Sequence, residues 1–125
     1  MGCDVMKSRI AGLALIAAAL LPDPATAQQF EPVREQAAFV EVVTGRQLTR
    51  FGIQLQVTPA GEIRGRAFGR PVTGAWLWRD GYFCRDLFWG ERDLGPNCQE
   101  VRIDGDTVRF ISDRGDGIYA DLRLQ

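Results

Sequence analysis

The sequence contains no histidine and a single lysine, Lys7, among its 125 residues. The absence of histidine removes the commonest general base, the usual metal ligand and every Ser-His or Cys-His nucleophile. Fifteen basic residues are offset by sixteen acidic ones, which gives a formal net charge of −1. Because nucleic-acid binding depends on a strong positive charge, we expect no nucleic-acid partner.

Long apolar runs are scarce, and the clearest one spans residues 10–21. Lys7 and Arg9 precede it and Ala25-Thr26-Ala27 follows it, which is the pattern of a secretory signal peptide cleaved after Ala27. A helix of 12 residues would span about 18 Å, short of a ~30 Å hydrocarbon core, so we expect no stable membrane anchor after cleavage. The sequence therefore predicts a signal peptide over residues 1–27, a single domain over residues 28–125, and a periplasmic or secreted protein.

Cysteine is also rare, with three in the chain, and only Cys84 and Cys98 follow the expected cleavage site. An even pair in an oxidising compartment predicts a disulfide. The pair has neither the Cys-x-x-Cys spacing of a redox site nor the further ligands of a zinc site. We therefore expect a structural disulfide, no metal and no cofactor.

From Phe51 onward, apolar and polar residues alternate, and tight-turn dipeptides such as Asp80-Gly81 and Asp104-Gly105 separate the runs. This pattern predicts seven or eight short antiparallel strands joined by hairpins. Closure would hide the edge strands, so we expect a small up-and-down barrel of the lipocalin-like kind, with a two-sheet sandwich as the alternative.

A short helix is expected before these strands. Pro32 suits its first turn, Gly45 suits its end, and Ala37, Val40 and Val43 would share its buried face.

The turn at Asp80-Gly81 pairs Trp78 with Phe83 and Trp76 with Arg85 when it is treated as a two-residue loop. One face of this hairpin then carries Leu87 together with Trp76, Trp78, Phe83, Arg85 and Trp89, and we single out these last five. These residues are either ordinary core, with Arg85 stacked over Trp76 as a cation–π pair, or a candidate binding face for an apolar molecule. The same reasoning at Asp104-Gly105 pairs Val101 with Val108.

Candidates for catalysis are few. Asp86 lies on the opposite face of the first hairpin, where burial would raise its pKa, but the pattern places no second acid near it. Residues 115–120 match the dinucleotide fingerprint G-x-G-x-x-A, yet only five residues follow, too few for the helix that the mechanism needs. We predict no catalytic residues and no enzymatic activity.

Residues 74–85, GAWLWRDGYFCR, followed by Trp89 and then Asn97-Cys98-Gln99, resemble a family of small, uncharacterised secreted bacterial proteins. These proteins share Gly-x-Trp, a turn, Phe/Leu-Cys and a second cysteine some 14 residues later, and the resemblance covers residues 30–125. Some members are labelled dihydrodipicolinate reductase. The failed fingerprint and the short chain do not support reductase activity here.

More loosely, the size, export and disulfide are similar to those of lipocalin-like barrels that inhibit secreted metalloproteases or lysozymes. This similarity implies an inhibitor of, or interaction partner for, an envelope or secreted hydrolase, with residues 91–97, the longest expected loop, as the contact. The sequence thus predicts a non-enzymatic exported binding domain for a small apolar molecule, with this protein partner as the alternative.

Overall fold

The computed structural model describes residues 29–125, and the expected signal peptide with its cleavage site after Ala27 lies outside the described residues. The described chain is mainly β, with one short helix near its start. Its elements are β1 (Glu31–Val33), α1 (Gln36–Val43), β2 (Leu48–Arg50), β3 (Ile53–Val57), β4 (Glu62–Ala67), β5 (Arg70–Arg79), β6 (Tyr82–Trp89), β7 (Arg92–Asp104), β8 (Thr107–Ile111), the 3₁₀ helix η2 (Asp113–Gly115) and β9 (Tyr119–Leu124).

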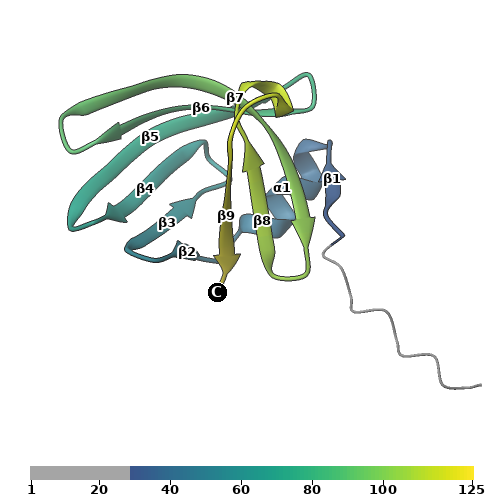
Figure 1. Cartoon of the computed structure of the whole chain (residues 1–125), viewed down its shortest axis with the longest axis horizontal. Coiled ribbons are helices and arrows are strands. Elements are labelled where there is room, and N and C mark those ends of the chain that lie inside the picture. Colours follow the sequence, from purple (N-terminus) through teal and green to yellow (C-terminus); the bar gives the residue numbers. More distant parts are fainter. Residues whose placement is uncertain (1–28) are drawn as a thin grey trace, which may run out of the picture.

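Strands β2 to β9 form a closed antiparallel barrel in which each strand pairs with the next along the chain, and β9 pairs with β2 to complete the ring (Figure 1). This confirms the up-and-down barrel and excludes the sandwich. Strand β1 lies outside the ring, paired with the end of β7 beyond the point where β6 stops.

The ring is closed unevenly. Strands β5 and β6 pair along eight residues each, whereas β2 and β9 meet at two pairs, Leu48 with Leu124 and Thr49 with Arg123. On that side of β9, residues 119–122 have no strand partner within the described chain. The joint between β2 and β9 is therefore the shortest in the barrel, and we call it the seam.

The turn between β5 and β6 has the predicted register. Asp80 and Gly81 both adopt positive φ, 54° and 85°, as a type I′ turn requires. Trp78 accordingly pairs with Phe83, and Trp76 pairs with Arg85.

The register predicted for the β7–β8 hairpin is wrong. Its loop is Gly105-Asp106, so that Asp104 pairs with Thr107, and Ile103 rather than Val101 opposes Val108. Gly105 takes a positive φ of 57° at the first loop position, where type II′ turns place glycine. The shift is two residues, so the same side chains still face the barrel interior.

The N-terminal segment also differs from its prediction. Pro32 is in the edge strand β1, where its missing N–H is tolerated, and the helix begins four residues later at Gln36. The buried helix positions are Phe39 and Val43, four residues apart, while Ala37 is exposed. The largest apolar side chain, Phe39, thus decides which face of α1 packs against the barrel.

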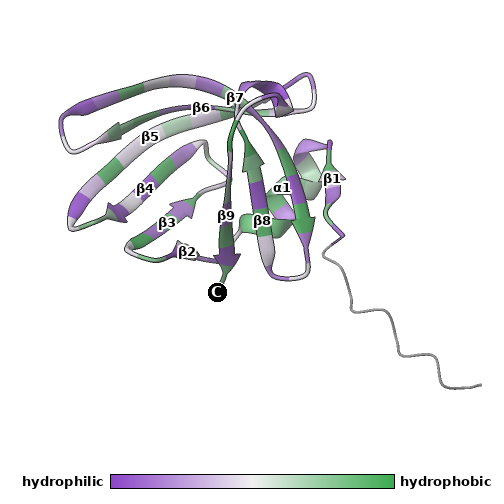
Figure 2. Ribbon diagram, viewed as in Figure 1, coloured by the Kyte–Doolittle hydropathy of each residue, from purple (hydrophilic) through white to green (hydrophobic). Residues whose placement is uncertain are grey.

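The core occupies part of the barrel interior and the space beneath α1. Phe39 is fully buried and its ring lies 5.0–5.3 Å from the rings of Trp76, Trp78 and Phe83, measured between centroids. Phe110 completes this aromatic cluster at 6.4 Å from Phe39. Along the strands, apolar and polar residues alternate in Figure 2, as one buried and one solvent-facing side require. Helix α1 and the aromatic cluster close one part of the barrel interior.

Cys84 and Cys98 form the predicted disulfide, which joins directly opposed residues of β6 and β7. Both lie on the outer face of the sheet, because their neighbours Phe83 and Gln99 point inward and are buried. The bond indicates an oxidising, extracytoplasmic compartment. Within residues 29–125, no helix has the length and apolar character needed to cross a membrane.

Candidate functional site

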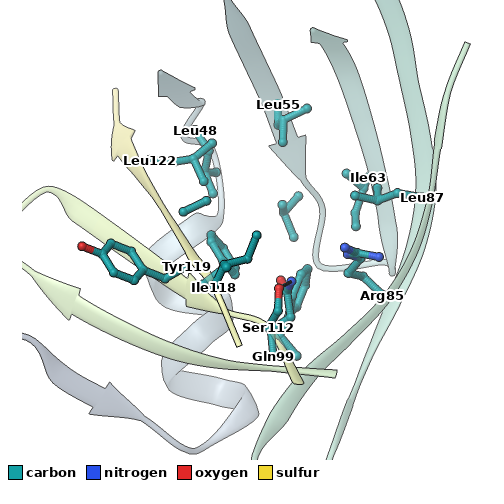
Figure 3. Close-up of a pocket in the computed structure, with 14 residues that line it drawn as sticks. Leu48, Leu55, Ile63, Arg85, Leu87, Gln99, Ser112, Ile118, Tyr119 and Leu122 are labelled. Atoms are coloured by element: carbon teal, nitrogen blue, oxygen red, sulfur yellow. Dashed lines mark hydrogen bonds between the residues drawn. The ribbon is translucent and has the colours of Figure 1, made fainter. Parts of the chain in front are cut away.

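A cavity of about 250 Å³ lies inside the barrel, beside the aromatic cluster (Figure 3). Its walls are largely aliphatic, and the main contributors come from five strands: Leu48, Leu55, Val57, Ile63, Leu87 and Leu122. Phe83 and Phe110 line it as well as belonging to the aromatic cluster, so the cluster forms one end of the cavity. Alternation along each strand explains this lining, because every second residue of a barrel strand points inward.

The mouth of the cavity lies where β9 begins. Ile118, Tyr119 and Ala120 line the cavity, and they belong to or directly precede the stretch of β9 that has no partner on the seam side within the described chain. Ile118 is 83% exposed although its side chain borders an apolar cavity. The incomplete pairing at the seam thus coincides with the opening of the cavity to solvent.

Three polar residues interrupt the apolar lining: Arg85 from β6, Gln99 from β7 and Ser112 next to η2. Figure 3 shows the side chain of Arg85 extending into the cavity from β6. Gln99 is buried, and its Nε2 donates to Ser112 Oγ at 3.2 Å. The cavity therefore has an apolar body and one polar wall.

Arg85 is held by a single neutral acceptor. Its Nη1 donates to the backbone oxygen of Gly95 at 2.7 Å. Partial burial lowers the pKa of Arg85, and the nearby charge of Asp86 partly opposes this shift. A guanidinium keeps its proton in proteins even so, which leaves a positive charge on the cavity wall.

The segment that carries Ser112 is anchored to β7. Asn97 Nδ2 donates to Asp113 Oδ1 at 2.8 Å, and the Asp113 N–H donates to Asn97 Oδ1 at 3.0 Å. The N–H of Ser112 donates to the oxygen of Ile118, so the same loop positions the residue at the mouth. Gly115 fits closely here, because a Cβ on it would lie 2.4 Å from Glu100 Oε2.

The five residues of the candidate binding face all lie on the inner side of the barrel, but they do different things. Trp76 and Trp78 pack against Phe39, Phe83 belongs both to that cluster and to the cavity, and Arg85 lines the cavity. Trp89 lies further along β6, beneath Arg70, whose guanidinium carbon is 4.6 Å from the ring centroid.

Each of the three indole groups is held in place by a backbone carbonyl. Their Nε1 atoms donate to the oxygens of Thr58, Arg34 and Ala67, at 2.8 Å from Trp76, 3.0 Å from Trp78 and 2.8 Å from Trp89. Arg85 is bonded to Gly95 instead of being stacked on Trp76, and the cation–π pairs of the described chain involve other arginines. The tryptophans therefore serve mainly as packed walls, and Arg85 is the member of the face that meets the cavity with a polar group.

Closure of the ring brings to the cavity residues that were not predicted as site residues. Leu48, Leu122 and Ala120 come from β2 and β9, which are far apart in sequence. Period-two alternation from Phe51 onward predicted the strands, but nothing local pairs the first barrel strand with the last. A period-two pattern in residues 118–124 was the available signal.

Two further expectations are wrong. Residues 92–97 are not a loop but the start of β7, joined to β6 by the tight turn at Gly90-Glu91. Asp86 is exposed on the outer face rather than buried. Residues 29–125 hold no group of three or more His, Cys, Asp or Glu side chains placed to bind a metal ion.

Comparison with protein-family models, with curated proteins and with solved structures found no match to this chain.

Proposed function

We propose that the chain is a non-enzymatic binding protein, periplasmic or secreted, that holds a small apolar molecule inside its barrel. The observation that carries this proposal is the cavity of about 250 Å³ with aliphatic walls, open beside the seam. A cavity of about 150 Å³ lined by Leu, Ile and Phe is known to stay dry and to bind benzene, so this one suits a somewhat larger apolar group.

Ala120 provides a direct test, because it is a small residue on the cavity wall. Ala120→Leu adds three carbons to the lining and should abolish binding of 1-octanol, which the native protein should bind. Ala75 lies exposed on β5, so Ala75→Leu is the matched control and should leave octanol binding unchanged.

Binding would be followed by calorimetry and by the NMR shifts of the Leu and Ile methyl groups. Methyl shifts confined to the cavity residues are expected. Octanol that fails to bind the native protein, or that binds Ala120→Leu equally well, contradicts the proposal.

The alternative function is interaction with an envelope or secreted hydrolase. One observation favours it: the apolar side chains of Leu77, Phe88 and Leu94, all from β5–β7, are exposed. A stoichiometric hydrolase recovered from envelope extract by the oxidised protein, and lost on Leu77→Ser and Leu94→Ser, would support this function. A partner retained by both variants would argue against this surface.

A further inference from the structure

The charge of Arg85 on the cavity wall takes part in no ion pair within the described chain. Ion pairs within residues 29–125 join Arg46 to Asp106, Arg64 to Glu62, Arg102 to Glu100 and Arg109 to Asp121, and none of them includes Arg85. The neighbouring acid, Asp86, lies on the opposite, outer face of β6. Arg85 thus places a half-buried cation against an apolar cavity without an acidic partner.

Burying an unpaired charge opposes folding, and such charges in proteins are normally matched by an ion of opposite sign. Burial lowers the pKa of Arg85 but leaves the group charged, so the unpaired positive charge is not removed by loss of a proton. An anionic group on the ligand would pair with this charge.

The donors available at this wall suit a carboxylate. A guanidinium has five N–H donors in a planar fork, and the bond to the Gly95 oxygen uses one of them. Ser112 Oγ accepts from Gln99, which leaves the Ser112 hydroxyl proton free to donate into the cavity. Two donor groups, one on β6 and one next to η2, therefore line the same apolar space.

We propose that the ligand is an apolar molecule bearing one carboxylate, with Arg85 and the hydroxyl of Ser112 binding the carboxylate and the aliphatic walls enclosing the rest. This inference rests on the proposed function and names the chemical class of its ligand.

Three molecules with the same eight-carbon chain test the proposal by calorimetry at pH 7.5: octanoate, 1-octanol and octylammonium. Octanoate should bind the native, oxidised protein about 10- to 100-fold more tightly than octanol, as expected for hydrogen bonds to charged groups. Octylammonium should bind more weakly than octanol, because the cation would lie beside Arg85.

Variants assign the effect to the residues. Arg85→Gln should reduce octanoate affinity about 10- to 100-fold and abolish the preference for octanoate over octanol. Ser112→Ala should reduce that preference by a smaller factor. Arg79→Gln is the matched control, because Arg79 is an exposed arginine on the same hairpin, and it should change neither affinity. Thermal melts and circular dichroism would show that each variant is folded.

The possible failures are distinct. If octanol binds and octanoate binds no better, or if folded Arg85→Gln retains octanoate affinity, the carboxylate assignment is overturned while the apolar binding function stands. If Arg85→Gln does not fold, Ser112→Ala decides, and an unchanged preference for octanoate overturns the assignment. If none of the three molecules binds the native protein, both proposals are overturned.

Discussion

At the scale of single residues, Phe39 links the helix to the barrel. Its ring is fully buried and contacts aromatic rings from β5, β6 and β8. Edge-to-face and tilted aromatic pairs of this kind add to the stabilisation from buried area. Phe51, by contrast, is 91% exposed in the turn between β2 and β3. The same substitution to alanine can therefore be compared at a buried and at an exposed phenylalanine.

Phe39→Ala should lower the free energy of unfolding by about 3–5 kcal/mol, because it leaves a hole among four aromatic rings. Phe51→Ala should change the free energy by less than about 0.5 kcal/mol. Urea denaturation followed by tryptophan fluorescence measures both. Equal effects of the two substitutions would show that α1 is not packed on the barrel as described.

At the scale of elements, the β6–β7 hairpin is constrained twice, by its strand pairing and by the disulfide across its outer face. The cysteines are 14 positions apart in the sequence. In the chain-entropy model, closing a loop of about 15 residues stabilises the folded state by roughly 3 kcal/mol. The bond lies away from the cavity, so its loss should affect stability rather than binding.

A double variant, Cys84→Ala with Cys98→Ala, should therefore fold and bind octanol as the native protein does. Its free energy of unfolding should be about 2–4 kcal/mol lower. A reductant should lower the stability of the native protein by a similar amount and have no effect on the double variant. A double variant that keeps full stability would show that the β-sheet pairing alone fixes this hairpin.

The same hairpins show how far the sequence determines the elements. Asp80-Gly81 favoured a type I′ turn, and the structure has the register that this turn gives. Asp104-Gly105 looked equivalent but places its glycine first in the loop, and the dipeptide alone does not distinguish the two arrangements. Pro32 is compatible with both a helix start and an edge strand, and its pairing with β7 decides between them. Local chemistry thus predicted the strands and the disulfide, whereas contacts distant in sequence settled these ambiguities.

At the scale of the whole molecule, the barrel is closed by a short joint between its first and last strands. The seam has two residue pairs, against eight between β5 and β6. The cavity lies next to the seam and is lined from both sides of it, which no local pattern could indicate. Local openings occur where few contacts hold an element, so the seam is where this barrel should open most readily.

Native-state hydrogen exchange should therefore be fastest, among barrel strands, at the amides of β2 and of residues 119–122 that point to the seam. The amides that pair β5 with β6 should be the slowest and should approach the exchange rate set by global unfolding. Octanoate should slow exchange at the seam more than at β5–β6. Uniform protection around the ring would contradict an unevenly closed barrel.

The aromatic cluster has a further consequence because Phe83 and Phe110 form the inner end of the cavity while α1 packs behind them. Because this end is fixed, the cavity limits the length of a ligand that enters from the mouth. Each methylene that fits adds about 0.8 kcal/mol of favourable transfer, and the first one that does not fit must stay in water or displace a packed ring. The barrel would then select its ligand by length as well as by charge, with Phe39 setting the limit from outside the cavity.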